Sequence, residues 1–172
     1  MFYELRRGHF TAERNTFHAE MNEFHHGLAT NSLALKFHHL GLAVREPSDA
    51  RVFVSMLGYR IGDPVFDPAQ NVHLQLCTHE AHPMVEIIWP ADTLGPLERL
   101  TKRHASGIIY HICYETKDLS ALLTQFSQAK LRFICISPPK TAPLFGGRMV
   151  SFYDVVGIGL VEILQPFGTP TS

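Results

Sequence analysis

The hydrophobic and polar positions of the chain follow one succession of periods, and that succession occurs twice. An apolar run at 40–44 predicts a strand. Apolar residues then recur at the i, i+3, i+4, i+7 spacing of one helix face, at Ala50, Phe53, Val54 and Leu57. Gly58 is expected to end this helix. Three short strands separated by turn residues follow, at 59–66, 71–77 and 84–88.

The second half of the chain repeats this order. A strand is predicted at 108–115, and Asp118 is placed to cap the next helix. The same apolar stripe returns at Leu119, Leu122, Leu123 and Phe126. Three more strands are expected, at 131–136, 148–153 and 159–164. Each half therefore predicts one strand, one helix and three strands, a βαβββ module.

Two short strands show the duplication in the residues themselves. Val85–Pro90 and Val161–Pro166 read VEIIWP and VEILQP, and each places one glutamate in an apolar strand. Upstream of each lies a histidine strand, and aligning His39 with His111 gives an offset of 72 residues. The offset between the two glutamates is 76, so the second copy carries four extra residues, which we assign to the loop 138–147.

Each copy thus contributes one imidazole and one carboxylate, from His39, Glu86, His111 and Glu162. A glutamate among Val, Ile and Leu is costly to bury unless it is paired, protonated or bound to a metal. Two matched pairs predict a metal site in a cleft between the modules. The alternative is an inert His–Glu hydrogen-bonded pair that the duplication copied. The donors suit Zn²⁺, Ni²⁺, Co²⁺, Mn²⁺ or Fe²⁺.

Three further residues are candidates for substrate binding. His73 and Gln75 alternate with apolar residues in one strand, and we expect them to point into the cleft. Arg148 opens a strand after two glycines, where it could bind an anionic group or be a solvated strand-end residue. His38 adjoins His39 and is expected to face the opposite way, in a surface or packing role.

The composition narrows the classes of function. A formal net charge of −1 gives no electrostatic reason to expect nucleic acid or an anionic membrane. No apolar run approaches the roughly 20 residues that span a bilayer, and the first residues lack the apolar region of a signal peptide. The cysteines lie in strand-like segments without metal-type spacing, as expected in a reducing compartment, at Cys77, Cys113 and Cys135. We therefore expect a cytoplasmic protein.

Residues 37–166 resemble the vicinal oxygen chelate superfamily, which includes glyoxalase I and methylmalonyl-CoA epimerase. The resemblance lies in FHHLGLAV at 37–44, VEIIWP at 85–90, IYHICYET at 109–116 and LVEIL at 160–164. It implies an α+β fold in which two paired βαβββ modules form a curved sheet around a metal-binding cleft. It also implies one divalent metal ion, of unknown identity, held through His39, Glu86, His111 and Glu162.

The duplication and the resemblance together divide the chain into an N-terminal extension and one domain. Residues 1–36 form the extension, which we expect to be helical, over 11–26, or poorly ordered. The domain, 37–172, consists of the modules 37–90 and 108–166 and the connector 91–107, which is expected to contain a short helix. The modules could pair within one chain or exchange between two, and a homodimer is expected.

The expected activity is proton transfer next to a metal-chelated carbonyl of a small-molecule substrate. We favour a glyoxalase I-like (lactoylglutathione lyase-type) lyase or isomerase, with Glu162 as the mobile base and Glu86 as the second acid or base. An acyl-CoA epimerase is the first alternative. It is placed second to the lyase because the epimerase branch commonly has glutamine where this chain has Glu86. That branch also has a second, non-ligand glutamate on the third strand of the first module, where Asn71–Cys77 contains no acid. Further alternatives are an Fe(II) ring-cleavage dioxygenase and a non-catalytic small-molecule (antibiotic) binding protein.

Overall fold

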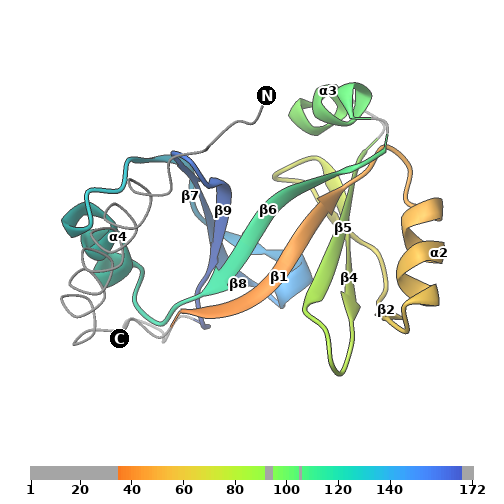
Figure 1. Ribbon diagram of the computed structural model, residues 1–172, viewed down its shortest axis with the longest axis horizontal. Coiled ribbons are helices and arrows are strands. Elements are labelled where there is room, and N and C mark those ends of the chain that lie inside the picture. The colour runs from red at the N-terminus through yellow and green to blue at the C-terminus, as the bar shows by residue number, and fades with distance from the viewer. Residues whose placement is uncertain (1–34, 92–94, 105, 168–172) are drawn as a thin grey trace, which may run out of the picture. The chain divides into compact units, whose positions relative to one another are not determined.

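The computed structural model describes residues 35–91, 95–104 and 106–167. The predictions made for 1–34, including the helix over 11–26, lie outside the described residues. The described residues form one curved sheet of nine strands with three α-helices (Figure 1). The strand order is β2-β4-β5-β1-β6-β9-β8-β7, and β3 also pairs with β4. The predicted α+β architecture is confirmed.

The first module contains the predicted succession of elements with one interruption. Its elements are β1 (Lys36–Ala43), α2 (Ser48–Met56), β2 (Arg60–Ile61), β3 (Val65–Asp67), β4 (Val72–Thr78) and β5 (Met84–Pro90). The single strand expected at 59–66 is split into β2 and β3. Pro64 lies between them, and a proline has no N–H to donate to β4.

The second module follows a connector helix, α3 (Pro96–Arg103). Its elements are β6 (Ile108–Glu115), α4 (Leu119–Gln128), β7 (Phe133–Ala142), the 3₁₀ turn η1 (Pro143–Phe145), β8 (Arg148–Val155) and β9 (Gly159–Leu164). Asp118 caps α4 as predicted, because its Oδ1 accepts a hydrogen bond from Ala121 N at 2.8 Å. The prediction of a loop over 138–147 is wrong for its first half, because β7 continues to Ala142 with two irregularities in its pairing. Because β7 lies at the edge of the sheet, no strand on its outer side needs the N–H that a proline lacks.

The two modules pair edge to edge within one chain. β1 lies antiparallel to β6, and Figure 1 shows these two strands side by side at the centre of the sheet. On the outer side of each, the last strand of the same module pairs in parallel: β5 with β1, and β9 with β6. The order of strands therefore has approximate two-fold symmetry about the β1–β6 pair, as the duplication requires.

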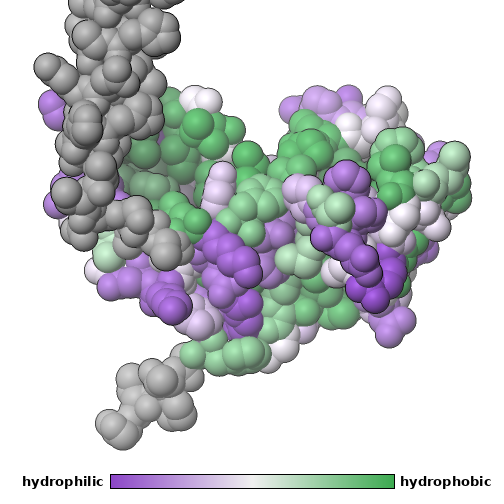
Figure 2. All heavy atoms as spheres, turned by 60° about the horizontal axis from the view of Figure 1, so that its bottom comes forward, coloured by the Kyte–Doolittle hydropathy of each residue, from purple (hydrophilic) through white to green (hydrophobic). Residues whose placement is uncertain are grey.

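The helix α2 buries less of its apolar stripe than its spacing predicts. Val54 is buried against Val44, Cys77 and Ile87, whereas Phe53 is 62% exposed. Leu57 and Met56 are exposed as well, so the predicted burial of the whole stripe is wrong. The nine-residue helix contacts the sheet mainly through its Val54 side. Figure 2 shows apolar side chains at the right-hand end of the surface, where Figure 1 places α2.

In the part of the chain that the structure describes, no helix is both long enough and apolar enough to span a membrane. The homodimer and the cytoplasmic location stay predictions.

Candidate metal centre

Two rows of paired residues cross the four central strands β5, β1, β6 and β9. Paired residues on neighbouring strands lie side by side, and their side chains share one face of the sheet. The first row is Glu86, Gly41 and His111, and the second is His39, Cys113 and Glu162. The rows face the same way because their members on β1 and β6 are two residues apart. The register therefore brings both histidines and both glutamates to one face.

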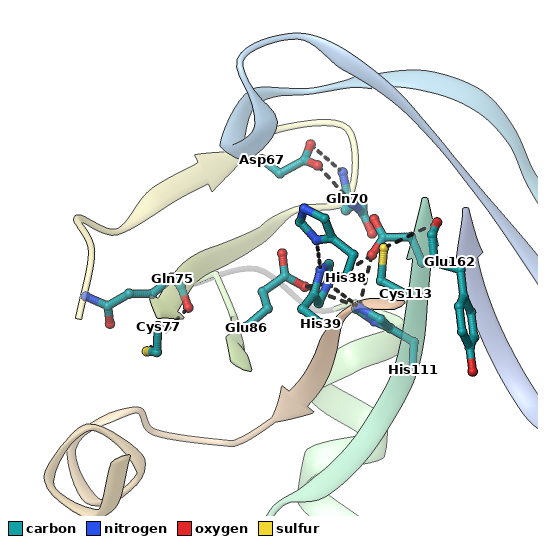
Figure 3. Close-up of polar contacts among 11 residues, drawn as sticks. His38, His39, Asp67, Gln70, Gln75, Cys77, Glu86, His111, Cys113 and Glu162 are labelled. Atoms are coloured by element: carbon teal, nitrogen blue, oxygen red, sulfur yellow. Dashed lines mark hydrogen bonds and ion pairs between the residues drawn. The ribbon is translucent and has the colours of Figure 1, made fainter. Parts of the chain in front are cut away.

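The four donor side chains converge on one point, as Figure 3 shows. His39 Nε2 lies 3.0 Å from His111 Nε2, 3.1 Å from Glu162 Oε2 and 3.5 Å from Glu86 Oε2. His111 Nε2 lies 3.1 Å from Glu162 Oε2 and 3.4 Å from Glu86 Oε2. None of the four residues is more than 3% exposed. The residues predicted as a ligand set are thus adjacent, and they come from both modules.

Proton sharing holds this cluster together when no cation is bound. Burial lowers the pKa of His39, but hydrogen bonds to Glu162 and Glu86, with their negative charges, outweigh it and raise that pKa to about 9. Burial alone would raise the pKa of Glu162. Hydrogen bonds to His111 and His39 overcome this effect and hold the pKa well below its usual range. The Glu162 carboxylate therefore stays ionised next to the protonated imidazole of His39.

The donor spacing fits a divalent cation. Metal–ligand distances of about 2.0–2.2 Å put neighbouring donors about 3.0 Å apart in an octahedron and about 3.4 Å apart in a tetrahedron. The five distances given above run from 3.0 to 3.5 Å, and all four donor atoms lie within 4.8 Å of one another. Two imidazoles and two carboxylates without thiolate suit Zn²⁺, Ni²⁺, Co²⁺, Mn²⁺ or Fe²⁺. The residues present could therefore hold the ion that the sequence predicts.

The pKa of His39 predicts how the stability of the metal-free protein depends on pH. A pKa raised from 6.5 to about 9 contributes stability that is complete below pH 6.5 and lost as the pH rises through 9. We expect the free energy of unfolding to fall by roughly 3 kcal/mol over this interval. Urea unfolding with a chelator present measures it, and metal-loaded protein is the control because a bound cation replaces the proton. A flat profile for the metal-free protein would contradict this expectation.

The cluster forms one wall of a cavity of about 280 Å³. Its apolar walls come from both modules and from the connector helix α3, through Val72, Leu74, Ile88, Leu97, Val150 and Phe152. Apart from cluster members, its polar lining consists of Gln70 and Tyr110. Gln70 is oriented by Asp67, which is buried and accepts its Nε2–H at 2.9 Å. Among the described lining residues there is no lysine or arginine, so the part of the cavity away from the cluster suits an uncharged, largely apolar group.

His73 and Gln75 lie on the opposite face of β4, so their predicted position in the cleft is wrong. Leu74 lines the cavity, and alternation turns its two neighbours toward α2. Gln75 Oε1 accepts a hydrogen bond from Arg51 Nε at 2.7 Å. The ring of His73 stacks on that of Trp89 with centroids 5.3 Å apart. Gln75 therefore ties α2 to the sheet, whereas His73 packs on Trp89, over which the guanidinium of Arg51 also lies.

Arg148 lies outside the cavity lining. Its Nη2 is 3.1 Å from Glu115 Oε1, and its Nε donates to the carbonyl of Gln165 at 2.9 Å. The guanidinium therefore already has an ionic partner, and a role in substrate binding stays a prediction.

His38 is the clearest residue that the sequence analysis misassigned. It does not face away from its neighbour, because its Nδ1 lies 2.8 Å from His39 Nδ1. Burial first, and then the charge of His39, lower the pKa of His38 to about 4, so this imidazole is neutral at pH 7. An irregularity in the pairing of β1 with β6 breaks the alternation here, and a single sequence carries no signal for it. Gln70 and Tyr110 were also missed. Gln70 lies in the turn between β3 and β4, and Tyr110 reaches the cavity at the second irregularity in the β1–β6 pairing.

Comparisons with known proteins agree with this architecture. Residues 38–152 match the profile of the Glyoxalase/Bleomycin resistance protein/Dioxygenase superfamily. That range contains three of the four cluster residues and ends before Glu162. An ethylmalonyl-CoA/methylmalonyl-CoA epimerase of Cereibacter sphaeroides is 26% identical over 106 residues, which cover 61% of this chain and 78% of that protein.

Solved structures share the fold at low sequence identity. Methylmalonyl-CoA epimerase from Mycobacterium tuberculosis superposes with a TM-score of 0.62 at 15% identity, over 77% of this chain and 88% of that one. A protein of Bacillus halodurans C-125 described as hypothetical gives 0.63 at 18%, over 81% and 99%. A variant of the Streptomyces coelicolor methylmalonyl-CoA epimerase in complex with 2-nitronate-propionyl-CoA gives 0.61 at 13%, over 77% and 98%.

Proposed function

Because this chain belongs to the glyoxalase/bleomycin resistance protein/dioxygenase superfamily, we propose that it is a metal-dependent enzyme that epimerises an acyl-CoA thioester. The observation that carries the proposal is the buried cluster of two imidazoles and two carboxylates beside an apolar cavity. A divalent cation bound there would polarise the thioester carbonyl and make the neighbouring C–H more acidic. His39, Glu86, His111 and Glu162 are the residues that would hold it.

The two carboxylates provide the acid and base that epimerisation needs. In an epimerisation the proton leaves one face of the carbon and returns to the other. Glu162 is on β9 of the second module and Glu86 on β5 of the first, on opposite sides of the β1–β6 pair. Glu162 would remove the proton and Glu86 would return one, while both histidines remain fixed.

The epimerase reading now stands ahead of the glyoxalase I-like lyase that the sequence analysis preferred. The named relatives among the proteins described above are epimerases of ethylmalonyl-CoA and methylmalonyl-CoA. The cavity of about 280 Å³ is large enough for a short acyl group, with the rest of the coenzyme outside. Its apolar walls suit an alkyl substituent on the reacting carbon.

Glyoxalase I-like (lactoylglutathione lyase-type) chemistry is the second candidate, and a specific observation favours it. Glu86 supplies a carboxylate where the epimerase branch commonly has glutamine. Moreover, the face of β4 that lines the cavity carries Val72 and Leu74 rather than an acid. The site thus has the two-histidine, two-glutamate set but lacks a separate, non-ligand carboxylate among its described lining residues.

Deuterium exchange distinguishes the two reactions. Protein purified without chelator or affinity nickel is loaded with Co²⁺ and incubated in D₂O, either with methylmalonyl-CoA or with the hemithioacetal of methylglyoxal and glutathione. We expect deuterium at C2 of the thioester, detected by mass spectrometry, and none without metal. Conversion of the hemithioacetal alone would favour the lyase. Metal-loaded protein that acts on neither substrate would contradict both readings.

A further inference from the structure

Each module places one unpaired residue directly before its histidine ligand. The pairing of β1 with β6 is irregular at two places. His38 has no partner in the ladder at the first place, and Tyr110 has none at the second. They precede His39 and His111, and the 72-residue offset relates them to each other. Because a bulge interrupts alternation, each pair of consecutive residues lies on the side of the cluster.

The imidazole of His38 is held against His39 by contacts on two sides. Its Nδ1 lies 2.8 Å from Nδ1 of His39, the ring nitrogen that points away from the cluster centre. The ring of Phe145 meets it edge-on, with centroids 5.3 Å apart. Phe145 also packs on the ring of His39 itself, at 5.5 Å. Figure 3 shows the two imidazoles joined in this way above the cluster.

The equivalent position in the second module has no such contact. Tyr110 meets the ring of His111 edge-on, with centroids 5.6 Å apart, and lines the cavity. The Nδ1 atom of His111 is buried and has no hydrogen-bond partner among the described residues. Nδ1 of His39 therefore has a hydrogen-bond partner, whereas Nδ1 of His111 has none among the described residues.

We propose that His38 is a positioning residue for the metal site, accepting the Nδ1–H of His39 and so directing the Nε2 lone pair of His39 at the cation. A neutral imidazole carries one proton, so a ligand that binds through Nε2 must bear its hydrogen on Nδ1. The Nδ1 atom of His38 is the acceptor for that hydrogen. His39 is then the pre-oriented anchor of the site, and His111 is the less constrained ligand. This inference rests on the metal site of the proposed function.

Variants at the two related positions test the asymmetry. His38→Phe keeps a ring against Phe145 but removes the acceptor, whereas the side-chain oxygen of His38→Asn can take the place of Nδ1. We expect His38→Phe to weaken Co²⁺ binding roughly 10- to 100-fold, as loss of such outer partners does. The Co²⁺ affinity of His38→Asn should stay within about threefold of that of the unmodified protein, because the acceptor is kept. The matched control Tyr110→Phe should also stay within this range, because Tyr110 does not supply an acceptor to His111.

Competition with a chromophoric chelator gives the affinities, and the visible absorption of bound Co²⁺ reports on its coordination. The inference is overturned if folded His38→Phe binds Co²⁺ as tightly as the unmodified protein. It is also overturned if His38→Asn or Tyr110→Phe loses as much Co²⁺ affinity as His38→Phe. His38→Ala provides the same comparison should His38→Phe fail to fold. Because no turnover is measured, a protein that passes this test but does not act on acyl-CoA would contradict the proposed function alone. Absence of Co²⁺ binding by the unmodified protein would overturn both.

Discussion

Replacement of Glu162 by Gln should reduce proton exchange on the substrate by about 10²- to 10⁴-fold, the contribution of a positioned general base. Glu162 is 3% exposed, and hydrogen bonds to His111 and His39 hold its pKa well below the usual range, so it is ionised before substrate arrives. Glutamine has nearly the same shape and can still offer an oxygen to a cation. It cannot accept a proton at neutral pH, so catalysis should fall more than metal binding.

The measurement is the rate of deuterium incorporation by Co²⁺-loaded protein whose metal content has been determined. Glu80→Gln is the matched control, because Glu80 is exposed in the turn between β4 and β5 and does not line the cavity. Its exchange rate should equal that of the unmodified protein. If metal-loaded Glu162→Gln exchanges at the full rate, another group is the base.

The cluster of four buried residues could be predicted from the sequence because the duplication supplied an internal comparison. A single glutamate in an apolar strand has several explanations, but Glu86 and Glu162 stand in near-identical strands with matched histidines upstream. Alternation then requires residues two apart to share a face. The β1–β6 register, which pairs Gly41 with His111, then brings the residues of the two modules to the same face of the sheet.

Alternation does not say which face of a strand lines a cavity. In β4 the polar residues His73 and Gln75 share one face, and the prediction assigned that face to the cleft. The cavity wall is apolar, so Leu74 faces it instead, and Gln75 on the other face bonds to Arg51 of α2. The position of His38 was unpredictable for another reason. It depends on a bulge, and the bulge exists only through pairing with a strand distant in the sequence.

Replacement of Gly41 by Ala should weaken Co²⁺ binding by more than about 100-fold, beyond the usual loss of an outer partner. An added Cβ would lie 2.5 Å from Nδ1 and 2.6 Å from Nε2 of His111, which no real side chain tolerates. The obstructing atoms belong to a buried ring, so either His111 or the β1 backbone must move. Overpacking of this kind typically costs about 1–3 kcal/mol of stability as well. Glycine is required here for space, since the imidazole occupies the place of a side chain.

A double-mutant cycle separates this clash from a general effect of alanine on β1. In a His111→Ala background the imidazole is gone, so Gly41→Ala should then cost little in the free energy of unfolding, and the two effects should not add. Gly95→Ala is the matched control, because Gly95 has an extended backbone (φ −146°) at the start of α3, outside the cavity lining. It should leave the Co²⁺ affinity and absorption unchanged. Equal destabilisation by Gly41→Ala in both backgrounds would mean that the ring of His111 does not rest on Gly41. The shared register of the two modules would then not be what positions this histidine.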